Sequence, residues 1–135
     1  MVGSDPQEHL TLLLDVFNPI VLGNESEYRV ALRVYLDTWF KSRCRGDGAT
    51  AKVRAGRRMR WLEQTLKPLL TQLSAPLRRR LKNALALTLG IDSIVIMRDV
   101  CGLDDKEGLD VLRWTAQIIL EAVMKETQNE TTSVG

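Results

Sequence analysis

The residue types best suited to nucleophilic catalysis or metal binding are scarce in this sequence. His9 is the only histidine, and Cys44 and Cys101 are the two cysteines, without the C-x-x-C spacing of a zinc site or redox centre. Neither cysteine has a neighbouring base in the sequence, and neither a G-x-S-x-G nucleophile motif nor a phosphate-binding loop occurs. We therefore expect a protein that is not an enzyme and that uses no metal or cofactor.

Two carboxylates in an apolar context are the next candidates for chemistry. Asp92 lies in the middle of the longest apolar segment, and Asp99 follows two helical turns later on nearly the same side. A buried carboxylate is costly unless it is paired or protonated. One interpretation is therefore an internal ion pair for each, and the candidate partners are Arg33, Arg98 and Arg113. The other is that Asp92 lines a ligand pocket and recognises a hydrogen-bond donor or a cation.

Aromatic and apolar side chains at helical spacing could line such a pocket. Tyr35 and Trp39 would lie on the inner face of one helix and Met59 and Leu62 on that of the next, with Phe17 nearby. Pockets that combine aromatic side chains with a few polar groups occur between the helices of bundles. The same spacing is also typical of ordinary core packing. The predicted ligand-binding residues are Phe17, Tyr35, Trp39, Met59, Leu62, Asp92 and Val95.

Helices must position these residues, because the hydrophobic periodicity is helical and no convincing alternating strand pattern occurs. Asn18-Pro19 and Pro68 are expected to end or bend helices, while Ser74 and an aspartate at 104 or 105 are expected to cap them. The predicted fold class is therefore all-α, a bundle of about five helices. Their predicted ranges are 6–16, 26–44, 51–66, 75–101 and 106–126, with a short helical piece over 69–73.

The last two predicted helices carry more apolar surface than one bundle can bury. In helix 75–101 the apolar arc is far wider than the roughly 100° stripe of a surface helix. Ala86 and Gly90 form a strip of small residues on its other side, beside Met97, and helix 106–126 has two apolar faces. The second face predicts contact with another copy of the chain. The predicted dimer interface is Ala86, Gly90, Met97, Val111, Trp114, Thr115, Ile118 and Ala122.

Length and composition fit one globular domain, with 135 residues of which 44% are hydrophobic and 27% charged. The net charge of +2 conceals an uneven distribution, because residues 41–82 hold 13 Lys and Arg against two acids, which gives +11 and leaves −9 elsewhere. Solvated helix faces explain this basic region most simply, but it could also serve nucleic acid, an anionic membrane surface or an anionic ligand. No signal peptide or membrane span is evident, so we expect a cytoplasmic protein.

Two segments resemble the C-terminal regulatory domain of TetR-family transcriptional regulators. They are VRAGRRMRWLE, at 53–63, and LALTLGIDSIVIMRDVCGLDDKEGLDVLRWTAQIIL, at 85–120. The second combines a long apolar helix ending in RDVCGL, an acidic cap, VLRW and a final amphipathic helix. The resemblance implies an all-helical domain that dimerises through its last two helices as a four-helix bundle and holds an effector pocket among the others.

The function that the resemblance implies is effector sensing, with a small apolar ligand relayed allosterically to a DNA-binding domain. The family's N-terminal helix-turn-helix unit is not evident in this sequence, so DNA contact is expected only through such a domain outside the chain. Residues 10–127 would form the regulatory domain, residues 1–9 a disordered or cloning-derived start and residues 128–135 a flexible tail. The alternative is a helical module that binds nucleic acid or another protein through the basic region 41–82.

Overall fold

The computed structural model describes residues 5–44 and 56–133, and in these ranges the chain is helical apart from short turns, which confirms the predicted all-α class. Residues 51–55 of the predicted third helix lie outside the described ranges. The described helices are α1 (Pro6–Gly23), α2 (Glu25–Cys44), α3 (Arg57–Leu70), α4 (Ala75–Ala86), α5 (Ile91–Val95) and α6 (Asp105–Ser133), with a π-helical turn η1 (Ile96–Val100) between the last two.

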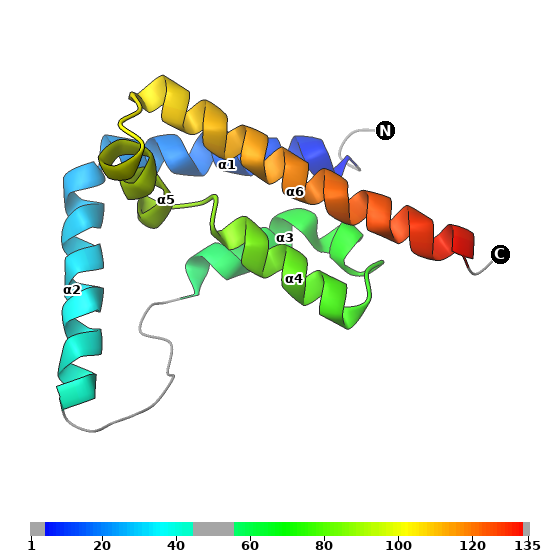
Figure 1. The fold of residues 1–135 in the computed structure, drawn as a ribbon, viewed down its shortest axis with the longest axis horizontal. Coiled ribbons are helices and arrows are strands. Elements are labelled where there is room, and N and C mark those ends of the chain that lie inside the picture. Colours follow the sequence, from blue (N-terminus) through cyan, green and yellow to red (C-terminus); the bar gives the residue numbers. More distant parts are fainter. Residues whose placement is uncertain (1–4, 45–55, 134–135) are drawn as a thin grey trace.

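A leucine-rich core lies between α1, α3, α4 and α6. Figure 1 shows how these four helices are arranged. α6 runs antiparallel along α1, since Gln7 Nε2 donates to the Gln117 carbonyl and Arg113 pairs with Asp15. α3 and α4 pack against each other, while α2 stands apart at one end of the molecule, where it contacts α1 and α5. Fully buried side chains of the core include Leu10, Val21, Leu62, Leu66, Leu81, Leu85, Leu89 and Leu120.

The predicted break at Asn18-Pro19 is wrong, because α1 passes through Pro19 and ends at Gly23. Proline removes one backbone donor from the helix, but Pro19 faces solvent while its neighbour Asn18 is 1% exposed. Asn18 Nδ2 donates to the Thr88 carbonyl at 3.0 Å, and its Oδ1 accepts from the Gly90 amide at 3.0 Å. Tertiary contacts thus hold this part of α1 in the core. Likewise α3 passes through Pro68 and ends at Leu70.

The predicted single helix over 75–101 is also wrong. α4 begins at Ala75 with Ser74 as its N-cap, as expected, but ends at Ala86. The chain then turns, and α5 begins after Gly90, whose φ of 97° is one that residues with a side chain rarely adopt. The wide apolar arc therefore belongs to two helical segments separated by a turn, and each buries its own face.

The end of this region is a π-helical turn rather than a regular helix. In η1 the Cys101 amide donates to the Ile96 carbonyl at 3.0 Å, five residues back, and Gly102 follows at a φ of 68°. Asp104 then caps α6, because its Oδ1 accepts from the Glu107 amide at 2.9 Å. α6 continues to Ser133, beyond the predicted end at Glu126, so much of the expected flexible tail has helical backbone.

Candidate ligand-binding site

A cavity of about 580 Å³ lies between α2 on one side and α1, the start of α3 and the α4–α5 junction on the other. Its wall is mostly apolar and aromatic, with a few charged side chains. Such a volume and lining are typical of small-molecule sites. The lining residues are Phe17, Glu27, Tyr28, Ala31, Leu32, Tyr35, Gly56, Arg57, Arg58, Met59, Trp61, Ala86, Gly90 and Ile91.

Three of the predicted ligand-binding residues line this cavity, namely Phe17, Tyr35 and Met59. Trp39 does not. It lies one turn beyond Tyr35 on α2, is 43% exposed, and contacts the ring of Phe40 and the guanidinium of Arg43 on its own helix. Leu62 is a fully buried core residue, so its prediction as a pocket residue is wrong.

Val95 also packs against the core rather than the cavity. Helical spacing correctly predicts which face of a helix points inward, but it does not distinguish a cavity wall from the close-packed layer beside it. Asp92 is likewise absent from the lining, although it contacts a residue that belongs to the lining.

Several lining residues were not expected from the sequence. Tyr28, Ala31 and Leu32 precede Tyr35 at helical spacing on the same face of α2, which is a signal that the sequence does contain. Trp61 meets Phe17 edge-to-face, with ring centroids 4.7 Å apart and an angle of 76° between the rings. This aromatic pair joins α3 to α1 at the cavity wall.

Arg58 is the polar residue that best fixes the geometry of the cavity. Its Nη1 donates to the Ala86 carbonyl at 3.1 Å, and its Nη2 lies 3.3 Å from Asp92 Oδ1. The guanidinium packs against Gly90, where no side chain intervenes. Because the Arg58 side chain is only 24% exposed, its charge is partly removed from water. Arg58 therefore links the first turn of α3 to both sides of the α4–α5 turn.

The two candidate carboxylates are both ion-paired, but neither is buried and neither pairs with a predicted arginine. Asp92 pairs with Arg58, and its side chain is 41% exposed. Asp99 accepts two hydrogen bonds from Arg29, both 2.9 Å long, and is 50% exposed. The expectation of burial fails because the turn after α4 changes the direction of the helix that carries them. The interpretation that both carboxylates form ion pairs is confirmed, but the partners are Arg58 of α3 and Arg29 of α2.

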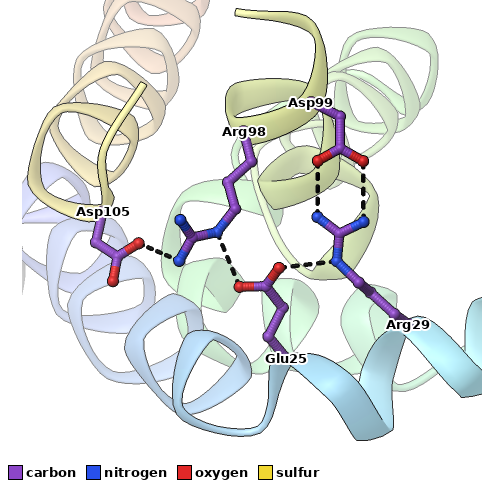
Figure 2. A network of polar contacts seen from close by, with 5 residues as sticks. All are labelled: Glu25, Arg29, Arg98, Asp99 and Asp105. Carbon is purple, nitrogen blue, oxygen red and sulfur yellow. Dashed lines mark hydrogen bonds and ion pairs between the residues drawn. The ribbon is translucent and has the colours of Figure 1, made fainter. Parts of the chain in front are cut away.

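Asp99 belongs to a charge network, shown in Figure 2, that joins three elements. Arg29 bridges Asp99 and Glu25, and Glu25 in turn accepts from Arg98 Nε at 2.8 Å, while Arg98 also pairs with Asp105. The hydrogen bonds from Arg29 hold the pKa of Asp99 below its usual value, and the Asp99 carboxylate in turn raises the pKa of Arg29. The network ties the start of α2 to η1 and to the first residue of α6.

The structure corrects part of the predicted dimer interface. Ala86 and Gly90 line the cavity, and Gly90 is buried within the chain, so these two residues do not form an outer strip. Met97 packs within its own chain, where its side chain lies close to Gly108 of α6: a Cβ atom at position 108 would be only 3.3 Å from Met97 Cβ. The other predicted residues lie along α6: Val111, Trp114, Ile118 and Ala122 are exposed, and Thr115 is half-buried.

Internal contacts occupy part of the basic region. Lys82 Nζ lies 2.5 Å from Glu63 Oε1, and this contact lowers the pKa of Glu63. Arg78 donates to the Leu70 and Leu73 carbonyls, which caps the end of α3 and the turn after it. Together with the pairing of Arg58, these contacts support the interpretation of solvated and internally paired helix faces.

Neither of the described ranges contains a cluster of three or more histidine, cysteine or acidic side chains arranged to hold a metal ion. Among the helices of these ranges, none combines the length and the apolar character needed to cross a membrane. Comparison of the chain with protein-family models, curated proteins and solved structures found no match. The cavity and the exposed face of α6 are therefore the features from which a function can be inferred.

Proposed function

We propose that this chain is the effector-sensing and dimerisation domain of a TetR-like transcriptional regulator. The observation that carries the proposal is the cavity of about 580 Å³, whose wall is formed by residues of α1, α2, α3 and the α4–α5 junction. A site whose wall comes from several helices can respond to occupancy by changing how those helices lie relative to each other. The proposed ligand is a small molecule with a mainly apolar body.

A route from the cavity to the surface helices supports the sensing role. Arg58 lines the cavity and contacts Asp92 of α5, and α5 continues directly into η1. There Asp99 and Arg98 reach α2 and the start of α6. If these contacts have two alternative arrangements, a ligand that binds one of them more tightly would favour that arrangement and shift the position of α6. A ligand with equal affinity for both arrangements would leave α6 where it is.

The exposed apolar surface of α6 supports the dimerisation role. Trp114 is 62% exposed and Ile118 is 45% exposed, and they lie one helical turn apart on one face. The antiparallel neighbour α1 exposes Leu12, Val16 and Ile20 at intervals of four residues. Exposed apolar side chains on two neighbouring helices favour an interaction site, and a second copy of the chain is the simplest partner. Control of DNA would then require a helix-turn-helix domain joined to this dimer.

Binding of the neutral fluorophore N-phenyl-1-naphthylamine tests the proposed ligand site. In a variant with Trp39→Phe and Trp114→Phe, the cavity residue Trp61 is the remaining tryptophan, so its energy transfer to the bound probe reports proximity to the cavity. We expect saturable binding with one probe per chain. Ala31→Trp would obstruct the cavity and abolish binding, which is followed here by direct excitation of the probe because the variant adds a tryptophan.

Val34→Trp is the matched control, because Val34 lies three residues along α2 but is 54% exposed and outside the lining. This variant should bind the probe as the parent protein does. Equal loss of binding in both variants, or no saturable binding in the parent protein, would contradict the proposed function.

A further inference from the structure

Three charged residues line the cavity. Arg57 and Arg58 are on the first turn of α3, and Glu27 is a solvent-exposed acid of α2. Arg57 is solvent-exposed, so an ion pair with it would be worth little. Arg58 differs, because its side chain is 24% exposed and it lies against buried Gly90. A charge held in a partly dry site attracts an opposite charge more strongly than one in water.

We propose that the cavity binds a hydrophobic carboxylate, whose carboxylate group pairs with Arg58 and whose apolar body packs on Phe17, Trp61 and Met59. This inference rests on the proposed function, since it names the class of ligand for the same cavity. A guanidinium offers five N–H donors in a planar fork that matches a carboxylate, and such charge-assisted bonds are among the strongest in proteins.

The contacts of Arg58 allow a ligand carboxylate to compete for it. The bond from Nη2 to Asp92 is long, at 3.3 Å, and the Asp92 side chain is 41% exposed, so exchanging this bond for one to a ligand costs little. The bond from Nη1 to the Ala86 carbonyl and the packing on Gly90 hold the guanidinium in place without neutralising its charge. Arg58 is therefore a fixed cation whose acidic partner is exchangeable.

Calorimetric titration with 2-naphthoate and its neutral isostere 2-naphthamide, at pH 7 and low salt, tests the inference. The two probes share one ring system, so their affinities differ through the carboxylate. We expect naphthoate to bind about tenfold more tightly than the amide or better. Arg58→Met should reduce this ratio to about one with little change for the amide. Arg60→Met, on the same helix but outside the lining, should leave the ratio as it is.

A second variant keeps the test decisive if Arg58→Met fails to fold, which circular dichroism would reveal. Asp92→Asn removes the competing carboxylate and leaves Arg58 in place, so naphthoate should bind severalfold more tightly while the amide is unaffected. Equal affinities for the two probes in the parent protein, or no gain for naphthoate in Asp92→Asn, would overturn the inference and leave the ligand site standing. If neither probe binds the parent protein, the proposed function and this inference both fail.

Discussion

The guanidinium of Arg58 occupies the space that a side chain at Gly90 would need. A Cβ atom at position 90 would lie 2.4 Å from Arg58 Nη2 and 3.0 Å from Cζ. Gly90 also has a φ of 97°, so the turn between α4 and α5 depends on glycine for two separate reasons. Two residues 32 positions apart thus shape one end of the cavity together.

Gly90→Ala should lower the free energy of unfolding by about 1–3 kcal/mol, because alanine is strained at this φ and its methyl group would displace Arg58. Urea denaturation followed by circular dichroism measures the change. Gly23→Ala is the control, since no neighbouring atom lies within 4 Å of a side chain there and its φ is not positive. A Gly90→Ala protein as stable as the control would show that the turn tolerates a side chain.

Asn18→Ala should cost roughly 1–3 kcal/mol of stability, because it leaves the buried Thr88 carbonyl and Gly90 amide without their side-chain partner. Hydrogen exchange at the Gly90 amide should also accelerate. Asn24→Ala removes an exposed bond to the Ile20 carbonyl and should cost well under half as much. Equal losses for the two asparagines would contradict the role assigned to Asn18.

Asp99→Asn should weaken the dependence of stability on acid pH. The pKa of Asp99 is lower in the folded state than the value of about 3.9 expected in the unfolded state, so the ionised group stabilises the fold at pH values above that value. This contribution is lost as the pH falls through the folded-state pKa. Denaturant midpoints measured from pH 7 to pH 3 should therefore fall less in Asp99→Asn than in the parent protein.

Asp37→Asn is the control for this titration, because Asp37 is an exposed acid of α2 outside the network of Figure 2. It should follow the parent curve. Parallel curves for Asp99→Asn and the parent protein would show that the Arg29 pair does not stabilise the fold.

Ile118→Glu should convert the proposed dimer to a monomer, because it places a charge in the middle of the exposed face of α6. Sedimentation equilibrium at micromolar concentration measures the mass. Val30→Glu changes a residue of α2 that is even more exposed, at 62%, and should leave the dimer intact. A parent protein that sediments as a monomer would contradict the assignment of α6 as an interface.

Local signals in the sequence predicted much of the fold. Ser74 and Asp104 cap α4 and α6 through their side chains, as their residue types and positions indicate. The inward faces of α3 and α4 follow from leucine spacing alone, since Leu62, Leu66 and Leu81 are all at most 1% exposed. These features depend on residues within a few positions of each other.

The features that the sequence did not reveal depend on distant residues. The segment 87–90 is compatible with helix apart from its glycine, and the turn there is stabilised by Asn18 and Arg58, both far away in the chain. The ion pair between Arg29 and Asp99 likewise joins residues 70 positions apart. The spacing of residues shows which face of a helix a charged side chain lies on. It does not show which residue of another helix lies opposite that side chain.

The same limit explains the outcome for the candidate site. Phe17, Tyr35 and Met59 were predicted because their helical faces point inward, and they do line the cavity. Trp39 shares the face of Tyr35 but lies one turn further along α2, where the helix projects away from the bundle (Figure 1). How far a helix extends past its neighbours is set by tertiary packing, which the spacing of residues does not encode.

The most direct test of the central claim, that the cavity binds a small molecule, is the detection of intermolecular nuclear Overhauser effects in a protein with ¹³C-labelled methyl groups and bound N-phenyl-1-naphthylamine. We predict contacts from the probe to the methyl groups of Ala31, Met59 and Ile91, which line the cavity from α2, α3 and α5. Contacts confined to the exposed α2 residues Val30 and Val34, or none at all, would contradict it.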